Sequence, residues 1–205
     1  MKWTLQNIAD WTGAEILSTH STEFNFVGTD TRSDLTQKVF VALKGDNYDA
    51  HDYLDQAVLK KAGLLLVHRL DPRFEALKDQ VSILLVKDTL QALQKFAQHY
   101  RQTLSAKIIG ITGSNGKTTT KEFTAEILNS FKKTHYNQGS FNNHWGVPLT
   151  LLQIEQDVAF AVVEMGMNHA GEIKRLVEIA NPDVVVCTMV GTAHLEFFGS
   201  QKKDC

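Results

Sequence analysis

The sequence predicts an α/β fold in two domains, on three observations. Apolar runs of strand length alternate with segments of helical periodicity, the pattern of sheets joined by crossover helices. A glycine-rich stretch separates one such run from the helix that follows it. The first series of alternating elements ends near residue 87. We therefore expect a small N-terminal α/β domain over residues 1–87 and a P-loop-type, mostly parallel central domain over residues 88–205.

The first domain is expected to begin with a helix. Thr4 is a suitable N-cap for a short helix that starts at Leu5 and stops at Gly13. Apolar spacing and β-branched or aromatic runs then predict the later elements. These are strands over 24–30 and 39–43, a turn over 44–47, a helix over 54–61, a strand over 64–67, a short helix over 73–79 and a strand over 82–86.

The second domain is expected to continue the alternation with parallel strands. Leu90, Leu93, Phe96, Tyr100 and Leu104 recur at helical spacing and predict a connecting helix. The order of the later elements is typical of a mostly parallel sheet with crossover helices. These are strands over 107–112, 133–136, 158–164 and 182–189, with helices from 118 to 131 and from 171 to 180.

Composition excludes several classes of protein. The chain has 205 residues, a hydrophobic fraction of 43% and a formal net charge of −2, so it can bury substantial cores. No basic stripe with interleaved aromatic residues suggests nucleic acid, and no apolar run suggests a signal core or a membrane span. The two cysteines, Cys187 and Cys205, give neither a disulfide framework nor metal-ligand spacing. A reducing cytoplasm is the expected location.

The stretch over residues 110–120 has the features of a phosphate-binding loop. It follows a buried strand and opens an amphipathic helix. Gly113 and Gly116 allow the backbone to approach phosphate closely, Lys117 suits the β- and γ-phosphates, and the Thr118 hydroxyl suits Mg²⁺. The general pattern requires glycine at position 111, where this chain has isoleucine. The other interpretation is a glycine turn with a solvated lysine.

Polar residues follow the neighbouring strands. Glu164 ends the strand over 158–164 and suits the second ligand position of a nucleotide-bound Mg²⁺, although a solvated or helix-capping glutamate is the alternative. His194 follows the next strand, where an ordinary satisfied histidine is the alternative. The amide-rich segment over 137–146 contains side chains that hold phosphate or cap turns.

Four blocks together resemble successive motifs of the Mur ligases. They lie at residues 113–119, 142–152, 164–173 and 193–196. Within that family, the blocks at 30–32, 39–45 and 49–51 resemble the members that add D-alanyl-D-alanine to UDP-N-acetylmuramoyl-tripeptide. The first-domain block around residues 30–32 argues against a folylpolyglutamate synthetase, another ligase of the same superfamily.

The resemblance implies an ATP-dependent, ADP-forming amide ligase of peptidoglycan precursor synthesis. The substrate carboxylate is phosphorylated to an acyl phosphate, and an amine then displaces phosphate. The implied catalytic residues are Lys117, Asn143, Glu164 and His194, and the implied Mg²⁺ ligands are Thr118, Glu164 and His194. The implied ATP-binding residues are Gly113, Ser114, Asn115, Gly116, Lys117, Thr118 and Thr119.

The resemblance also implies residues for the UDP part of the substrate. They are Asp30, Thr31, Arg32, Lys44, Gly45, Asp49 and His51. Arg32 and Lys44 suit a diphosphate chemically, whereas a solvated charge is the alternative for each.

The last residues depart from the family pattern. Mur ligases continue into a segment with a carbamylated lysine that helps to hold a second Mg²⁺, and then into a C-terminal domain. Lys202 and Lys203 come too soon to match that lysine, and Phe197 stands where the family usually has glycine. We therefore expect an incomplete central domain that does not form the amide bond by itself. The alternative hypothesis is a naturally shortened, non-catalytic UDP-muropeptide-binding protein with a regulatory or accessory role in the cell wall.

Overall fold

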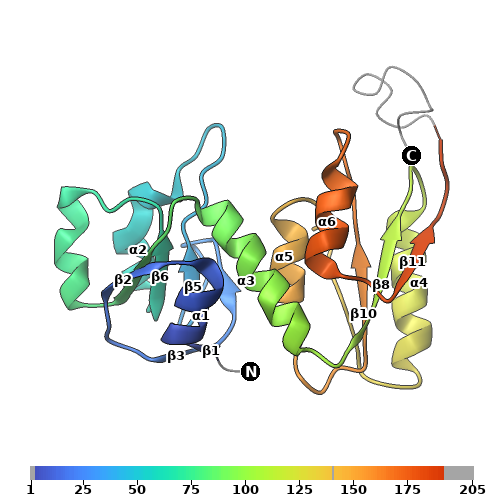
Figure 1. Ribbon diagram of the computed structural model, residues 1–205, viewed down its shortest axis with the longest axis horizontal. Coiled ribbons are helices and arrows are strands. Elements are labelled where there is room, and N and C mark those ends of the chain that lie inside the picture. The colour runs from blue at the N-terminus through green and yellow to red at the C-terminus, as the bar shows by residue number, and fades with distance from the viewer. Residues whose placement is uncertain (1–2, 140, 192–205) are drawn as a thin grey trace. The chain divides into compact units, whose positions relative to one another are not determined.

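Figure 1 shows the computed structural model of the chain, which describes residues 3–139 and 141–191. The chain divides into two compact units, Met1–Phe96 and Ala97–Cys205. The division falls inside helix α3 (Thr89–Thr103). This helix begins just after the boundary that the sequence predicts between residues 87 and 88. Each unit contains strands and helices in alternation, so the predicted α/β class is confirmed.

The first unit is built on a five-stranded sheet in the order β2-β7-β6-β5-β4. Its strands pair in parallel, except that β2 pairs antiparallel with β7. The strands over residues 39–41 and 64–67 are continuous apolar runs with buried side chains, as expected where both faces of a sheet are covered. The strands are β2 (Glu15–Ser18), β4 (Val27–Gly28), β5 (Val39–Val41), β6 (Leu64–Val67) and β7 (Ser82–Leu85).

Short helices connect these strands. The predicted first helix is present as α1 (Leu5–Thr12), in which the Thr4 hydroxyl accepts a hydrogen bond from the Asn7 backbone and Gly13 ends the helix in the left-handed region. The other helices of this unit are η1 (Ala50–Tyr53), α2 (Leu54–Leu59) and η2 (Pro72–Asp79).

The predicted strand over residues 24–30 is wrong as a single element. Phe26 has a positive φ of 59°, which interrupts an extended chain. The segment therefore forms β3 (Glu23–Phe24), which pairs with β1 (Trp3–Thr4), and β4, which joins the main sheet. Strand β2 lacks a prediction because it is a short edge strand without a clear alternation of apolar and polar side chains.

The second unit has a wholly parallel four-stranded sheet in the order β11-β8-β10-β9. The predicted parallel sheet is therefore confirmed. Its strands are β8 (Lys107–Thr112), β9 (Thr134–Tyr136), β10 (Phe160–Glu164) and β11 (Val184–Cys187), and its helices besides α3 are α4 (Lys117–Asn129), α5 (Gly146–Leu151) and α6 (Glu172–Ala180). Helix α5 lacks a prediction because it is short and contains both glycine and proline, which are poor helix formers.

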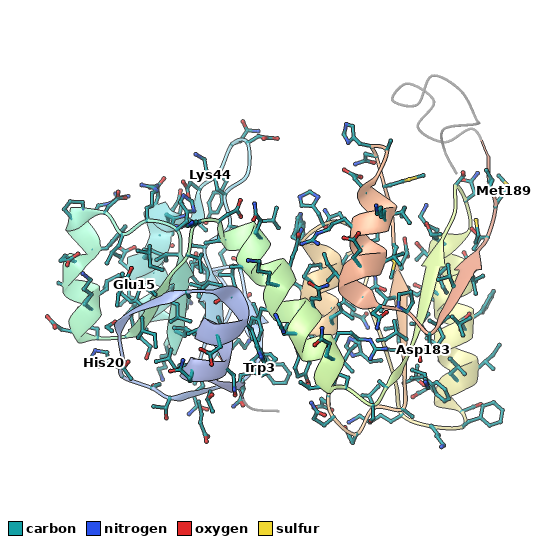
Figure 2. The ribbon with its side chains drawn as sticks, viewed as in Figure 1. Trp3, Glu15, His20, Lys44, Asp183 and Met189 are labelled. Carbon is teal, nitrogen blue, oxygen red and sulfur yellow. The ribbon has the colours of Figure 1, made fainter. Side chains whose placement is uncertain are left out.

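Strand register brings three strand ends together in this unit. Glu164 at the end of β10 pairs with Ile111, and Cys187 at the end of β11 pairs with Thr112. The start of β11 is fixed by Asp183, labelled in Figure 2, whose carboxylate accepts hydrogen bonds from Lys107 Nζ at 2.6 Å and from the Ile108 backbone at 2.9 Å. The residues that follow β8, β10 and β11 consequently lie at one edge of the sheet.

Among the described residues, no helix combines the length and the apolar character needed to cross a lipid bilayer.

Candidate functional site

The loop between β8 and α4 has the backbone of a phosphate-binding loop. Gly113 has a φ of 130° and Gly116 a φ of 79°, values that glycine adopts without strain. A Cβ atom at Gly113 would lie 2.3 Å from Thr188 Oγ1, whereas a Cβ atom at Gly116 would meet nothing within 4 Å. Gly113 is therefore required by both its conformation and its surroundings.

Helix α4 begins directly after this loop and has an open N-terminus. Gly116 occupies the N-cap position, and no side chain caps it. The first turn of a helix carries backbone amides without partners inside the helix, and its dipole favours an anion. The loop and the helix together therefore fit a phosphate group.

The Glu164 carboxylate lies beside this loop. The Thr118 hydroxyl donates to Glu164 Oε2 at 3.0 Å, and Asn142 Nδ2 donates to Glu164 Oε1 at 2.8 Å. The Glu164 side chain is only 2% exposed. A hydroxyl and a buried carboxylate at hydrogen-bond distance are both oxygen ligands of the kind that Mg²⁺ prefers, so these two residues fit the predicted metal position.

Lys117 lies over its own loop. Its Nζ group donates to the Gly113 carbonyl at 2.7 Å. The ammonium group thus lies at the loop, where it is bonded to backbone rather than extended away from it. A phosphate oxygen would have to replace that carbonyl as its partner.

The loop also contacts the residues that follow β11. The Ser114 amide donates to the Met189 carbonyl at 2.8 Å, and the Thr188 hydroxyl donates to the Asn115 carbonyl at 2.5 Å. Figure 2 labels Met189 on this segment. These contacts tie the loop to a distant part of the chain, since Thr188 and Asn115 are 73 positions apart. No local pattern in the sequence indicated them.

The remaining predicted residues of this site are placed differently. Thr119 is exposed on α4. The Asn143 side chain accepts hydrogen bonds from the backbone of Trp145 at 3.3 Å and Gly146 at 2.8 Å, so it holds the first turn of α5. Its neighbour Asn142 is the amide that reaches Glu164, and sequence reasoning did not single it out.

His194 lies outside the described residues. Within residues 3–139 and 141–191, no group of three or more His, Cys, Asp or Glu side chains is arranged to hold a metal ion. The metal fit in the described part of the chain thus rests on Thr118 and Glu164.

The first unit has a pocket of its own, with a volume of about 490 Å³. Asp30, Thr31 and Arg32, which the sequence predicts as ligand-binding residues, are among the residues that line it. Hydrogen bonds from the Arg32 side chain and backbone lower the pKa of Asp30 to about 2. The other lining residues are Thr29, Tyr48, Tyr53 and Gln56.

Two tyrosines form an aromatic wall of this pocket. The rings of Tyr48 and Tyr53 are stacked, with centroids 5.1 Å apart and planes 13° apart. Tyr48 is half-exposed at 50%, which leaves its ring available to a planar ligand. Sequence reasoning missed both residues, because their pairing is visible only when the loop after β5 is folded.

Four predicted residues of the first unit support that loop and do not line the pocket. Gly45 donates through its amide to the Tyr48 carbonyl at 2.8 Å, and exposed Lys44, labelled in Figure 2, forms an isolated antiparallel bridge with Asp49. Asp49 Oδ1 accepts from the His51 ring Nδ1 at 2.6 Å.

His51 is a buried structural residue in this arrangement. Its Nε2 atom accepts a hydrogen bond from the His68 backbone at 3.0 Å, so the proton is on Nδ1. Burial lowers the pKa of His51 and favours the neutral ring. Burial alone would raise the pKa of Asp49, but hydrogen bonds from His51 and Arg69 outweigh it and lower that pKa to about 2.

Residues 111–203 match the sequence profile of the family described as Mur ligase middle domain. The chain is 38% identical to a UDP-N-acetylmuramoyl-tripeptide–D-alanyl-D-alanine ligase of Bacillus subtilis, over 98% of this chain and 44% of the relative. It is 41% identical to the enzyme of the same name from Escherichia coli, over 96% of this chain and 42% of the relative. The chain therefore spans less than half the length of these curated relatives.

Solved structures show the same similarity. A crystal structure of MurF from Acinetobacter baumannii superposes with a TM-score of 0.91 at 35% identity, covering 100% of this chain and 45% of that one. A MurF ligase from Thermotoga maritima in complex with ADP superposes with a TM-score of 0.77 at 33% identity, covering 88% of this chain and 41% of that one.

Proposed function

Because the chain belongs to the Mur ligase family, we propose that it supplies two binding sites of a peptidoglycan-precursor ligase. The second unit binds ATP with Mg²⁺, and the first unit binds the uridine nucleotide part of UDP-N-acetylmuramoyl-tripeptide. The proposed reaction joins this tripeptide to D-alanyl-D-alanine. The relatives that carry this name are more than twice as long as the chain, so the whole reaction is proposed for the full set of domains.

The contact between Thr118 and Glu164 carries the proposal for the second unit. It joins the first turn of α4 to the end of β10 at 3.0 Å, beside a loop whose glycines permit close backbone approach. Thr118 and Glu164 would hold Mg²⁺, which neutralises phosphate charge when it is bound. The Thermotoga maritima MurF ligase was solved in complex with ADP, which supports nucleotide binding as part of the proposal.

The chain's own groups would act on the phosphates by position and charge. The amides at the start of α4 would donate to phosphate oxygens, together with loop amides other than that of Ser114, which donates to the Met189 carbonyl. Lys117, now bonded to the Gly113 carbonyl, would transfer its hydrogen bond to a phosphate oxygen and stabilise the negative charge that develops there. Asn142 would keep Glu164 fixed during this exchange.

The pocket of the first unit supports the uridine part of the proposal. It combines an aromatic wall, Tyr48 and Tyr53, with the exposed guanidinium of Arg32. A stacked base and a charged diphosphate require this combination of groups. The 490 Å³ volume lies within the range typical of small-molecule sites.

The proposed chemistry is acyl activation followed by amide formation. A carboxylate oxygen of the tripeptide attacks the γ-phosphorus of ATP, and ADP leaves. The amine of D-alanyl-D-alanine then attacks the acyl carbon, phosphate leaves, and the amine loses a proton.

His194, which lies outside the described residues, stays a proposed ligand of a second Mg²⁺. The absence of a disulfide pattern in the sequence supports a cytoplasmic location.

Calorimetry with ADP and Mg²⁺ tests the nucleotide site in the 205-residue chain. We expect Thr118→Ala to weaken Mg²⁺-dependent ADP binding about tenfold, which corresponds to the loss of about 1.4 kcal/mol from one charge-assisted contact. Thr124→Ala, on the same helix, is the matched control and should bind ADP as the parent does. Equal affinity of Thr118→Ala and the parent would contradict the metal assignment.

Titration with UDP-N-acetylmuramoyl-tripeptide tests the uridine site separately. We expect binding that is weakened by Tyr48→Ala and Arg32→Ala, with Arg175→Ala of the second unit, whose side chain is half-exposed, as the control. A parent chain that binds neither this compound nor ADP would refute the proposed function. Binding of both compounds, with no ADP release from ATP in the full-length protein supplied with D-alanyl-D-alanine, would favour the non-catalytic alternative.

A further inference from the structure

Lys121 is a fully buried lysine that the proposed nucleotide chemistry does not use. It lies on the inner face of α4, one turn after Lys117, and its side chain is 0% exposed. An ammonium group taken out of water is costly unless an opposite charge or hydrogen-bond acceptors compensate it. The position of those partners therefore indicates what Lys121 is held for.

The partners of Lys121 belong to the nucleotide site. Its Nζ group donates to the Gly139 carbonyl at 3.0 Å and lies 3.8 Å from Glu164 Oε2. The same group lies 6.0 Å from the centroid of the Tyr136 ring. The ammonium group is thus placed between the loop that follows β9 and the carboxylate that ends β10.

Glu164 is held through both of its oxygens. Oε2 meets Thr118 and Lys121, and Oε1 accepts from Asn142. The Glu164 backbone amide also donates to Asn137 Oδ1 at 3.0 Å. These contacts fix the rotation of the carboxylate about its last side-chain bond.

Lys121 acts on this carboxylate in two ways. Its charge attracts Oε2 directly. Its hydrogen bond to Gly139 holds the loop that also carries Asn137 and Asn142, which are the other residues that orient Glu164. A single buried side chain therefore supports the carboxylate from the helix side and from the loop side.

We propose that Lys121 is a positioning residue of the nucleotide site, which keeps Glu164 turned toward Thr118 so that the two residues together receive the divalent cation of a Mg²⁺-nucleotide. This inference rests on the proposed function of the second unit. Groups that orient a metal ligand without touching the metal change metal affinity strongly when they are removed. Lys121 meets that description through its contact with Glu164 and with the loop.

The experiment measures how strongly Mg²⁺ and ADP support each other's binding. ADP affinity is determined with Mg²⁺ and again in EDTA, and the ratio of the two is the metal coupling. Lys121→Met keeps the length of the side chain but removes the charge, and we expect it to lower the metal coupling about tenfold, with ADP affinity in EDTA unchanged. Lys132→Met, at an exposed position just after α4, is the matched control and should keep the parent coupling.

A double-mutant cycle shows whether Lys121 acts through Glu164. Glu164→Gln should remove most of the metal coupling, and Lys121→Met combined with Glu164→Gln should lower it no further. Lys121→Gln, which can still donate to the Gly139 carbonyl, is a second uncharged variant, and its coupling should also fall. Circular dichroism establishes that each variant is folded.

Each outcome decides the inference. Parent coupling in Lys121→Met, an equal loss of ADP affinity with and without Mg²⁺, or additive losses in the double variant would overturn the positioning role while leaving the proposed function intact. Unfolding of both Lys121→Met and Lys121→Gln would assign Lys121 to the fold and overturn it as well. A parent chain whose ADP affinity does not depend on Mg²⁺ would refute the proposed function, and the inference with it.

Discussion

The absence of a Cβ atom at Gly113 allows the loop before α4 to form. Its φ of 130° is a conformation that residues with a Cβ atom rarely adopt. A Cβ atom there would also meet the backbone nitrogen and oxygen of Met189 at 2.9 Å. Gly116 shares the positive φ but has open space around it. Substitution of Gly116 therefore tests backbone strain alone, whereas substitution of Gly113 tests strain together with a steric collision.

We expect Gly113→Ala to destabilise the second unit and to abolish ADP binding. Strain alone costs about 1–2 kcal/mol for a left-handed residue, and the collision with Thr188 and Met189 adds to it. Gly116→Ala, which carries the strain without the collision, should cost about 1 kcal/mol and keep measurable ADP binding. Urea unfolding and calorimetry measure the two effects. Equal losses of stability in both variants would show that the contact with Met189 is not limiting.

The Asp49 carboxylate gives the first unit a predictable response to acid. Its pKa falls from 3.8 to about 2 in the folded chain. A carboxyl with a lowered folded pKa contributes stability above its unfolded pKa, and this stability is lost as the pH falls toward the folded pKa. The contribution is therefore complete near neutral pH and disappears between about pH 4 and pH 2.

We expect the stability difference between the parent chain and Asp49→Asn to shrink by about 2 kcal/mol on going from about pH 5 to about pH 2. Urea unfolding at a series of pH values measures it. Asp55→Asn, at an exposed position of α2, provides the control for the loss of one surface carboxylate. A difference that stays constant with pH would mean that Asp49 is not preferentially ionised in the folded chain.

At the scale of elements, the connection between β9 and α5 contains two adjacent asparagines, Asn142 and Asn143, whose side chains support different structures. Asn143 accepts from the backbone at the start of α5, whereas Asn142 donates to Glu164. The first contact supports a helix, and the second supports the candidate metal site. Adjacent residues of identical chemistry therefore form a natural pair for comparison.

We expect Asn143→Ala to lower the stability of the second unit by about 1 kcal/mol, as is typical for the loss of a side-chain hydrogen bond. Asn142→Ala should instead weaken Mg²⁺-dependent ADP binding several-fold, with a smaller effect on stability, because Glu164 loses one of its fixed partners. Unfolding curves and calorimetry on the same two variants measure both quantities. The reverse assignment, with Asn143→Ala the weaker binder, would favour the placement of Asn143 near the phosphates.

Local patterns carried most of what the sequence could predict about these elements. Gly113, Gly116 and Thr118 are neighbours in a strand-loop-helix segment, so their arrangement follows from positions close in the chain. Lys121, Asn142 and Thr188 act through contacts with residues 18 or more positions away. No periodicity encodes such contacts. The break at Phe26 was missed for a related reason, because β propensity does not register a single residue of positive φ.

At the scale of the whole molecule, each unit has its own sheet and its own candidate site. The pocket of the first unit is lined by residues between Thr29 and Gln56. The candidate metal site of the second unit comprises Thr118 and Glu164. The two ligands should therefore protect different segments of the chain from hydrogen exchange.

We expect hydrogen exchange to separate the two ligands. UDP-N-acetylmuramoyl-tripeptide should slow exchange in the segments that contain Thr31 and Tyr48, whereas ADP with Mg²⁺ should slow exchange at the start of α4, because a bound ligand stabilises the segments that it contacts. Mass spectrometry of peptides from the exchanged chain measures both patterns, and adenosine serves as a ligand without phosphates. Protection of the first unit by ADP alone would contradict the assignment of the sites.

The register of β10 against β8 limits how this chain can change length in evolution or in the laboratory. Glu164 is paired with Ile111 at the last position of the ladder, and side chains of a strand alternate between faces with a period of two residues. One residue inserted within β10 would turn the carboxylate to the opposite face of the sheet. Insertions that preserve this register consequently lie outside β10, for example in the surface turn around residues 155–157, where the added residue does not enter the ladder.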